Sequence, residues 1–401
     1  MSDAGAPARG EGVRGSSRPR VGILGGGQLG RMTAEAARDL GVEVTILERE
    51  AGSPAGQIVG PSHEIVGDWR DATARAALAE RVDLITLESE FVAADALQWF
   101  VDRGTPVYPT PETLRVVQDK FLQKETLFRA GLAVPRFHPV RDESDLLAAG
   151  ADLGWPLLLK ARRLGYDGHG NVTVADPGES PAAIRSLVGP TERRDADLDL
   201  YVEEFVRFAG EIAVMVTRGR DGSIEAYPIV DTFQQNHICH EVVAPARIPS
   251  GVAEQARRIA IQAVEAVDAV GVVGVEMFWR DDGAVLLNEL APRPHNSGHY
   301  TIEACRTSQF ANHLRAVLGW PLGPVDLVAP GAAMVNLLGT RTALANPSGV
   351  EPARAVGRAY PHLYGKRDVR VGRKMGHITA LGDTPEGALA TARRAARRIV
   401  W

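Results

Sequence analysis

Two glutamates in the second half of the sequence have a spacing that predicts a metal-binding site. The apolar runs 272–279 and 284–290 flank Asp282-Gly283, a pair that favours a two-residue β-hairpin turn. That turn sets Glu276 directly opposite Glu289, with Cβ atoms roughly 5 Å apart. Facing carboxylates repel unless a cation compensates, and paired carboxylates commonly bridge Mg²⁺ to substrate phosphates. We therefore predict a magnesium site at Glu276 and Glu289; a solvated hairpin is the alternative.

The residues around the hairpin favour the metal site. Asn288 can add a neutral oxygen beside Glu289. The run 291–299 is too polar and too rich in turn-forming residues for a strand. It places four polar side chains next to the carboxylates, namely Arg293, His295, Asn296 and His299. We therefore expect the chain to be organised around residues 272–299.

A lysine and a glycine-rich loop in the middle of the chain predict phosphate binding. Lys160 lies inside the apolar strand 155–161, where we expect its partner to be a substrate phosphate. The alternative is an edge strand from which the lysine reaches water. The next segment is a flexible loop whose amides can approach phosphates, Gly165-Tyr166-Asp167-Gly168-His169-Gly170-Asn171. Because a strand follows this loop instead of G-K-[ST] and a helix, we predict a phosphate-covering hairpin and not a P-loop.

A second glycine motif lies near the N-terminus. Gly25, Gly27 and Gly30 fit the pattern G-x-G-x-x-G, and Glu48 follows near the distance expected for a ribose-binding acid. The motif alone indicates NAD, but such a turn binds any phosphate or anion, and a turn without a ligand is the alternative. Glu88 comes directly after the strand 84–87, at the sheet edge where parallel sheets bind ligands. We therefore take Glu88 as a candidate substrate contact.

The elements that position these residues are alternating strands and helices in the first part of the chain, and mainly strands in the later part. We expect strands at 21–24, 42–47, 84–87, 106–108, 155–161, 172–174, 200–205, 211–216, 227–230 and 234–240, and helices at 31–40, 93–103, 111–130, 252–267 and 307–317. The helix 111–130 carries Lys120 and is capped by Thr110. This order predicts an α/β part followed by α+β parts.

Composition limits the class of protein. A chain of 401 residues with 45% hydrophobic and 24% charged residues is globular and too long for one core. A net charge of −5 does not favour nucleic-acid binding. Cys239 and Cys305 make neither a disulfide framework nor a zinc spacing, which predicts a reducing, cytoplasmic location. No apolar run has membrane-spanning length, and residues 1–19 are expected to be a disordered tail.

Taken in order, these motifs resemble the ATP-grasp superfamily, in which two lobes hold ATP between antiparallel sheets. Longer segments are similar to the 5-(carboxyamino)imidazole ribonucleotide synthase family, also described as the ATPase subunit of phosphoribosylaminoimidazole carboxylase. These segments are GGGQLGRM, ARRLGYDGHGN, NELAPRPHNSGHYT, SQFANHLRAVLG and YGKRDVRVGRKMGH. The resemblance extends from residue 20 to the end, and it overrules NAD because the glycine turn of this family serves a ribonucleotide.

The resemblance implies a fold and a reaction. The fold would be an ATP-grasp fold with a Rossmann-like domain at 20–110, an ATP-grasp domain at 111–320 with a lid lobe at about 131–200, and a small domain at 321–401. The reaction would be the carboxylation of 5-aminoimidazole ribonucleotide in purine biosynthesis, with ATP, Mg²⁺ and bicarbonate, through carboxyphosphate. The partners would be these small molecules, without nucleic acid or membrane, and the family suggests a homodimer.

The resemblance also implies roles for residues. ATP would contact Lys120, Lys160, the loop Gly165 to Asn171, Glu203, Glu204, Phe205, Val206, Glu211, Gln234, Asn288 and Glu289. Tyr166, Asp167, Arg293, His295 and Asn296 would form the reaction centre. The planar fork of Arg293 suits carboxyphosphate. The ribonucleotide would contact Gln28, Leu29, Glu88, Ser297, Lys366 and Arg373, although without the resemblance Lys366 and Arg373 would be interpreted as a solvated basic face.

Three positions depart from the family pattern, and two other functions remain open. Gln234 replaces a histidine that the family often has, His169 replaces a common lysine or arginine, and Lys120 replaces an arginine of some relatives. The first two departures alter the expected pH response of nucleotide binding. Another ATP-grasp ligase, such as a formate-using glycinamide ribonucleotide transformylase or a biotin carboxylase, is one alternative. A nucleotide-sensing protein without catalysis is the other.

Overall fold

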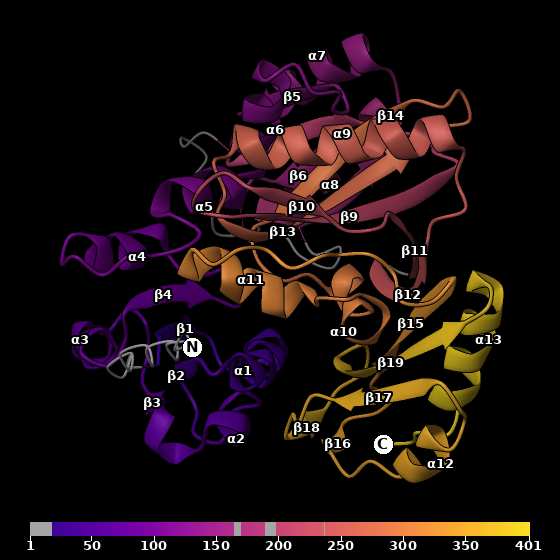
Figure 1. Ribbon diagram of the computed structural model, residues 1–401. Helices are drawn as coiled ribbons and strands as arrows, with labels where there is room; N and C mark the ends of the chain where they lie inside the picture. The colour runs from indigo at the N-terminus through magenta and orange to yellow at the C-terminus, as the bar shows by residue number, and fades with distance from the viewer. Residues whose placement is uncertain (1–17, 164–169, 189–197, 236) are drawn as a thin grey trace, which may run out of the picture.

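The computed structural model describes residues 18–163, 170–188, 198–235 and 237–401. Residues 1–17 of the predicted tail lie outside these ranges, as do Gly165, Tyr166, Asp167, Gly168 and His169 of the predicted phosphate loop. Within the described ranges the strands form a parallel four-stranded sheet, an antiparallel four-stranded sheet, a nine-stranded sheet and a two-stranded ribbon (Figure 1). The predicted combination of an α/β part with α+β parts is confirmed.

The N-terminal part is the parallel sheet, in the order β3-β2-β1-β4. Its strands are β1 (Arg20–Leu24), β2 (Glu43–Glu48), β3 (Glu64–Val66) and β4 (Leu84–Leu87), and its helices are α1 (Gln28–Leu40), α2 (Gly56–Val59), η1 (Pro61–His63), α3 (Ala72–Ala79) and α4 (Ala94–Val101). The predicted strands 21–24, 42–47 and 84–87 are confirmed. The predicted strand 106–108 is reduced to one bridge between Ile85 and Val107. Because β4 ends at Leu87, Glu88 lies at the carboxyl edge of the sheet, as predicted.

The single helix predicted at 111–130 is wrong, because the chain breaks it at Asp119. The two helices are α5 (Pro111–Gln118) and α6 (Lys120–Arg129). Asp119 has extended φ and ψ angles of −95° and 101°, and its carboxylate accepts the Leu122 backbone N–H at 3.1 Å as the N-cap of α6. The same carboxylate pairs with Arg162 at 2.6 Å. The break thus places Lys120 at the N-terminus of α6.

The second sheet is the small antiparallel sheet, in the order β5-β8-β6-β7. Its elements are β5 (Phe137–Val140), α7 (Glu143–Leu153), β6 (Leu157–Ala161), β7 (Asn171–Val174), η2 (Pro177–Glu179), α8 (Ser180–Val188) and β8 (Leu200–Glu204). β6 and β7 are antiparallel neighbours with Lys160 paired to Asn171, so the loop between them is a hairpin connection as predicted. β6 lies between β7 and β8, which excludes the edge-strand interpretation of Lys160.

The third sheet carries the acidic hairpin. Its strands are β9 (Gly210–Arg218), β10 (Ile224–Ala226), β11 (Val230–Gln235), β12 (Ile238–Ala244), β13 (Gly271–Trp279), β14 (Val285–Ala291), β15 (Gly331–Leu338), β17 (Ala359–Leu363) and β19 (Lys374–Gly382). Helix α9 (Ser250–Ala266) packs on β9, β13 and β14, and α13 (Pro385–Ala396) packs on β15 and β19 (Figure 1). We predicted a domain boundary at residue 320. Because β12, which precedes that residue, pairs with β15, which follows it, one sheet contains strands from both predicted domains.

The hairpin β13–β14 has the predicted pairing of Glu276 with Glu289, but the predicted two-residue turn is wrong. The Arg280 N–H donates to the Ala284 carbonyl at 2.9 Å, so the loop has three residues and ends at Gly283 with φ +83°. A β-bulge at Asn288 then shifts the register by one residue. The two shifts cancel at Glu276 and Glu289, which explains why the wrong turn led to the right pair.

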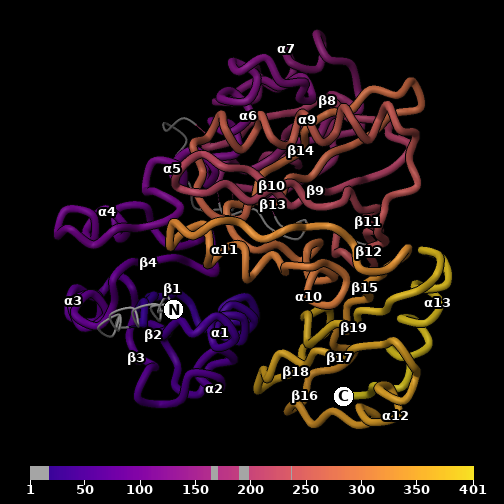
Figure 2. The backbone as a smooth tube through the Cα atoms, viewed as in Figure 1, coloured from indigo at the N-terminus to yellow at the C-terminus, as the bar shows by residue number. Residues whose placement is uncertain are grey.

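The remaining elements join the sheets. They are η3 (Asn296–Gly298), α10 (Thr301–Ala304), α11 (Gln309–Leu318), α12 (Val350–Arg354) and the ribbon of β16 (Ala343–Leu344) with β18 (Asp368–Val369). The backbone trace shows α11 between the N-terminal sheet and the large sheet (Figure 2). It contacts α1 on one side and β13 and β9 on the other. In the part of the chain that the structure describes, no helix has the length and apolar composition of a membrane span.

His313 on α11 ties the two neighbouring sheets together. Its Nδ1 accepts the Val272 backbone N–H at 3.2 Å, so Nε2 carries the proton and donates to the Thr86 hydroxyl at 2.8 Å. The side chain is buried, and burial lowers its pKa from 6.5 to about 4. Protonation of Nδ1 would place two donors against each other, so the folded state resists it.

We predict that stability falls on acidification partly through His313. The unfolded chain binds this proton below pH 6.5 but the folded chain binds it only below about pH 4. Between these values the unfolding free energy decreases by about 1.4 kcal/mol per pH unit from this group. His313→Asn keeps an acceptor near Nδ1 but does not titrate, so urea unfolding at pH 7 and pH 5 should show a smaller pH dependence than in the native chain. An unchanged pH dependence would contradict this role.

Candidate functional site

The centre of the site is the pair of carboxylates Glu276 and Glu289 on β13 and β14. Burial, followed by the charges of Glu289 and Glu211, raises the pKa of Glu276 to about 8. Burial also acts to raise the pKa of Glu289, but the charge and hydrogen bond of Lys120 lower it below its usual range. The pair therefore shares one proton and one negative charge at neutral pH. A divalent cation would replace that proton.

The residues present fit Mg²⁺. Glu211 Oε2 is buried without a hydrogen-bond partner among the described residues, and it faces the same cavity as Glu276 and Asn288. Within the described ranges no set of three or more His, Cys, Asp or Glu side chains forms a protein-only metal cage. This donor set suits Mg²⁺, which takes one or two carboxylates and completes its shell with phosphate oxygens and water.

Lys120 is placed beside the acidic pair by the cap of α6. Its Nζ donates to Glu289 Oε2, and Glu90 and Glu276 also lie close enough to raise its pKa, against the effect of burial. Its backbone N–H donates to the Arg162 carbonyl at 2.8 Å, directly after the end of β6. Lys120, a predicted ATP contact, thus lies next to Glu289, a predicted metal ligand.

Lys160 also has an acidic partner. Its Nζ donates to Glu203 Oε2 at 2.9 Å, while Lys124 lies 3.3 Å from Glu203 Oε1 and the Tyr201 hydroxyl donates to the same carboxylate at 3.0 Å. The side chains of Lys124 and Glu203 are each 2% exposed. Burial lowers the pKa of Lys124 to about 8, whereas the two lysines lower the pKa of Glu203 to about 2 despite its burial. The predicted partner of Lys160, a phosphate, would have to compete with Glu203.

The segment predicted to bind adenine lies at the end of β8. Glu203 is inside the strand, paired with Phe137 on one side and Leu158 on the other. The Glu204 carboxylate accepts the Arg136 N–H and pairs with its guanidinium at 3.1 Å. Phe205 and Val206 follow the end of the ladder. Their backbone groups are therefore better placed for a base than those of Glu203.

A narrow cavity joins most of the predicted nucleotide contacts on the large sheet. It is lined by Glu211, Ile212, Thr232, Gln234, Glu276, Met277, Phe278 and Asn288. Burial raises the pKa of Glu211, and a hydrogen bond from Gln234 lowers it to a smaller extent. The bulge at Asn288 explains why its side chain shares this cavity with Glu276.

The segment after β14 brings the predicted reaction-centre residues to the same place. The Arg293 guanidinium forms a two-pronged pair with Glu90, with Nη2 donating to Oε1 at 2.6 Å. His295 Nε2 lies 3.4 Å from Glu276 Oε1. Burial and the charges of Arg293 and Lys374 lower the pKa of His295 to about 3, so the imidazole is neutral at pH 7. This contact is therefore a neutral polar contact and not an ion pair.

Asn296 and Ser297 are held rigidly rather than exposed. The side-chain amide of Asn296 exchanges two hydrogen bonds with that of Asn336 on β15, at 3.1 and 2.7 Å. The Ser297 backbone N–H donates to His295 Nδ1 at 3.4 Å, and its side chain is buried in η3. Asn296 thus orients the segment from the large sheet.

The glycine turn differs from the expectation of exposed amides. Both oxygens of Glu88 accept backbone N–H groups, from Gly27 and Gly30, each at 2.7 Å. Glu48 accepts the Gly26 N–H at 2.7 Å. A Cβ on Gly27 would lie 2.3 Å from Glu88 Oε1, which explains the need for glycine there. The carboxylates of Glu48 and Glu88 thus accept the backbone N–H groups that a bound anion would use.

The substrate residues of the first and last parts of the chain meet. Leu29 packs against Met32, Phe310 and Tyr364 at the start of α1, where Gln28 begins the helix. The ammonium of Lys366 lies over the Tyr364 ring at 5.5 Å, donates to the Lys374 carbonyl at 2.6 Å and acts to lower the pKa of Glu88. Arg373 donates to the Asp368 carbonyl at 2.8 Å. Lys366 and Glu88 are thus neighbours despite their separation in sequence.

Three charged residues near the site were missed from the sequence. Glu90 pairs with Arg293, Lys124 pairs with Glu203, and Lys374 lies close enough to Glu276 and His295 to affect their pKa values. Lys124 could have been found, because an amphipathic helix that carries Lys120 places the residue at i+4 on the same face. The partner of Glu90 lies 203 residues away, so no local pattern predicts it.

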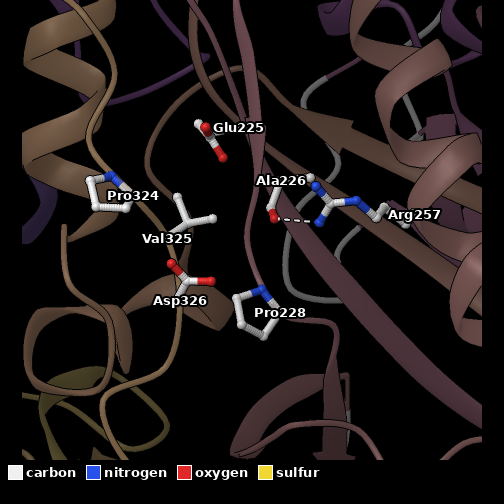
Figure 3. Close-up of a pocket in the computed structure, with 7 residues that line it drawn as sticks. All are labelled: Glu225, Ala226, Pro228, Arg257, Pro324, Val325 and Asp326. Carbon is white, nitrogen blue, oxygen red and sulfur yellow. Dashed lines mark hydrogen bonds between the residues drawn. The ribbon is translucent and has the colours of Figure 1, made fainter.

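A second cavity, of about 260 Å³, lies away from these residues. It is lined by Glu225, Ala226, Pro228, Arg257, Pro324, Val325 and Asp326 (Figure 3). Arg257 donates to the Ala226 carbonyl at 2.7 Å. None of its lining residues belongs to the predicted site.

Three family descriptions match successive parts of the chain. The ribonucleotide synthetase preATP-grasp domain matches residues 19–118, the ATP-grasp domain matches residues 125–310, and the phosphoribosylaminoimidazole carboxylase C-terminal domain matches residues 332–391. N5-carboxyaminoimidazole ribonucleotide synthase of Bacillus subtilis (strain 168) is 38% identical over 359 residues, which cover 90% of each chain. The chain belongs to the N5-carboxyaminoimidazole ribonucleotide synthase family. The predicted ATP-grasp fold and family are confirmed.

Other members of the synthase family match along the chain. The phosphoribosylaminoimidazole carboxylase of Schizosaccharomyces pombe is 45% identical over 376 residues, and this chain spans 66% of its length. A solved N5-carboxyaminoimidazole synthase from Aspergillus clavatus, in complex with ADP and 5-aminoimidazole ribonucleotide, is 35% identical with a TM-score of 0.84. That match covers 95% of this chain and 99% of the other. The synthetase from Thermotoga maritima has a TM-score of 0.83 at 38% identity, over 95% and 98% of the chains.

We predict that the buried charges around Lys160 are mutually dependent. Glu203→Gln leaves Lys124 and Lys160 without a full counter-charge and should decrease the unfolding free energy by about 3–5 kcal/mol. The neighbouring Glu204→Gln removes only a more exposed pair with Arg136 and should change it by less than about 1 kcal/mol. Urea unfolding of the two variants measures the difference. Equal losses would show that Glu203 is not the shared counter-charge.

Proposed function

We propose that the chain carboxylates 5-aminoimidazole ribonucleotide to 5-(carboxyamino)imidazole ribonucleotide, with ATP and bicarbonate, in purine biosynthesis. The observation that carries the proposal is the facing pair Glu276 and Glu289 with Lys120, Arg293 and His295 around it. Membership of the synthase family and the likeness to a relative solved with ADP and the ribonucleotide support it.

The first chemical step is phosphoryl transfer. A bicarbonate oxygen forms a bond to the γ-phosphorus of ATP, the bond from that phosphorus to the β,γ-bridging oxygen breaks, and ADP leaves. Such a step needs positioning and charge neutralisation more than covalent help. Lys120 and Lys160 would neutralise the phosphates once these displace Glu289 and Glu203. Mg²⁺ held by Glu276 and Glu289, with Asn288 beside them, would supply further charge neutralisation at the phosphates.

The second step forms the carbon–nitrogen bond. The exocyclic amine of the ribonucleotide attacks the carboxyl carbon of carboxyphosphate, the carbon–oxygen bond to phosphorus breaks, and phosphate leaves with the electron pair. The amine proton leaves with the phosphate or with a neutral base. The phosphate is the better acceptor, because the pKa of His295 is about 3 and its Nδ1 already accepts the Ser297 N–H; the neutral imidazole would line the reaction centre beside Glu276. Arg293 would hold the planar carboxyl group.

The residues proposed for the ribonucleotide come from three parts of the chain. Gln28, Leu29 and Glu88 would contact it from the first sheet, Ser297 from the segment after β14, and Lys366 and Arg373 would bind its 5′-phosphate. Within the synthase reaction, Tyr166 and Asp167 would meet bicarbonate and the amine, and the loop 165–171 would cover the phosphates. Magnesium dependence, a homodimer, a cytoplasmic location and domain boundaries near residues 110 and 320 stay predictions.

The test of the function is a coupled assay. With ATP, Mg²⁺, labelled bicarbonate and 5-aminoimidazole ribonucleotide, the chain should release phosphate and fix label into an acid-labile product in equal amounts. Replacing this substrate by glycinamide ribonucleotide and formate should abolish turnover. Phosphate release only with the latter pair would favour the transformylase, and no release with either would favour the nucleotide sensor.

We predict that Glu289→Gln decreases turnover by about 100-fold or more, because it removes a carboxylate that would hold the Mg²⁺ whose charge neutralises the phosphates. Thermal unfolding should stay close to that of the native chain, because Glu276 and Glu90 also lie near Lys120 and can compensate its charge. Glu112→Gln, on the exposed side of α5, is the matched control and should keep full turnover. Turnover of the Glu289 variant near the native value at ordinary Mg²⁺ would remove this residue from the metal site.

We predict that Lys366→Ala raises the apparent KM for the ribonucleotide about tenfold and changes kcat little, because it removes a charge-assisted hydrogen bond to a bound phosphate. Initial rates over a range of ribonucleotide concentrations at saturating ATP measure both constants. An unchanged KM would exclude Lys366 from the phosphate site.

A further inference from the structure

Glu90 holds the anion-binding edge of Arg293. We propose that Glu90 is a positioning residue that occupies this edge until the ribonucleotide binds, and that it thereby prevents ATP use without ribonucleotide. The inference rests on the proposed function, because it concerns when Arg293 becomes free for the carboxyl group.

The geometry of the pair is that of a bound carboxylate. Arg293 Nη2 donates to Glu90 Oε1 at 2.6 Å, and Nε donates to the other oxygen. Arg293 Nη1 donates to the Pro294 carbonyl at 3.2 Å. The side chains of Arg293 and Glu90 are only 18% and 21% exposed. One edge of a guanidinium binds one planar carboxylate in this way, so Glu90 and a carboxyphosphate cannot occupy it together.

Glu90 is mounted on the part of the chain proposed to bind the ribonucleotide. It lies two residues after Glu88, at the carboxyl edge of the parallel sheet, whereas Arg293 follows β14 of the large sheet. Gln118 Nε2 donates to the backbone carbonyls of Glu90 and Val92 at 2.5 and 2.7 Å and holds the segment at both points. Only Ser89 separates the two glutamates, so displacement of Glu88 would act on the orientation of the Glu90 side chain while Gln118 keeps the Glu90 backbone carbonyl in place.

Glu88 gives the segment a reason to shift. Its two oxygens accept the N–H groups of Gly27 and Gly30, which are the groups at the start of α1 that a ligand would seek. A ribonucleotide that contacts this turn must compete with Glu88 for them. Displacement of Glu88 then changes the position of Glu90 relative to Arg293.

The surrounding charges can accept the separated partners. Lys120 lies close enough to Glu90 for its pKa to respond, and Arg293 responds in the same way to Glu88 and Glu289. Each member of the pair thus has a second partner of opposite charge nearby. Opening the pair would not leave an isolated charge in the site.

The consequence concerns wasted ATP. If Arg293 were free without ribonucleotide, it could stabilise carboxyphosphate where no amine is present to attack. The carbon–oxygen bond of that intermediate would then break to give CO₂ and phosphate, and one ATP would be lost for no product. Glu90 in the edge of Arg293 disfavours this route.

The test compares phosphate release with label fixed. The full chain is assayed with ATP, Mg²⁺ and labelled bicarbonate, with and without 5-aminoimidazole ribonucleotide. Glu90→Gln keeps the shape but removes the charge, so phosphate release without ribonucleotide should rise about tenfold, and phosphate released per label fixed should exceed one. Glu112→Gln, a solvent-facing glutamate paired with Arg115 at 3.1 Å, is the control and should stay coupled.

A second variant makes the test independent of how well the first one folds. Glu90→Asp keeps the charge but withdraws it by one methylene, and it should uncouple in the same direction to a smaller extent. Native coupling in both folded variants, or equal losses of rate with and without ribonucleotide, would overturn the proposal and leave Glu90 a structural role. A native chain that fixes no label would instead overturn the proposed function, so the two failures are distinguishable.

Discussion

The facing of Glu276 and Glu289 across the β13–β14 hairpin is the constraint on which the rest of the site depends. Two carboxylates at this spacing repel each other, and a cation is needed for both to be charged at neutral pH. The pKa of Glu276 is raised so that it keeps a proton at pH 7, and Lys120 compensates the charge of Glu289. The cap at Asp119, which begins α6, is what brings Lys120 to this position. The hairpin and the helix break are therefore parts of one electrostatic arrangement.

The same arrangement recurs at the other cations proposed for ligands. Lys160 is paired with Glu203, Arg293 with Glu90, and Lys366 lies near Glu88. An anionic ligand that binds these cations would therefore have to replace the carboxylate now paired with each of them. Such exchange keeps the charge of a buried site nearly constant, which limits the desolvation cost of an unpaired lysine or arginine. It also makes specificity depend on geometry, since a ligand must offer its oxygens where these carboxylates now lie.

Much of this could be predicted from the sequence, for reasons that particular residues make clear. The strand–turn–helix of the first sheet and the pairing of Glu276 with Glu289 follow from local apolar patterns and turn residues. The two-residue turn was wrong because a three-residue loop with Gly283 and a bulge at Asn288 have the same net effect on the register. The long helix at 111–130 was wrong because Asp119 finds two partners, Leu122 and Arg162, that a helical conformation would not offer together.

The partners of the charged residues could not be predicted in this way. Glu203 and Lys160 are 43 residues apart, and Glu90 and Arg293 are 203 residues apart. These contacts depend on how the sheets pack, and not on propensity or periodicity. The family resemblance predicted that these lysines and arginines contact ligands. Only the fold shows which carboxylate is paired with each of them.

The most direct measurement is a crystal structure of the chain grown with a non-hydrolysable ATP analogue and Mn²⁺ in place of Mg²⁺, with the metal located by its anomalous signal. The account predicts a metal bound by carboxylate oxygens of both Glu276 and Glu289 at roughly 2.0–2.3 Å, with phosphate oxygens completing its shell and Lys120 moved from Glu289 to a phosphate. A metal and nucleotide bound elsewhere, with Glu276 still beside His295 and Lys120 still on Glu289, would contradict it.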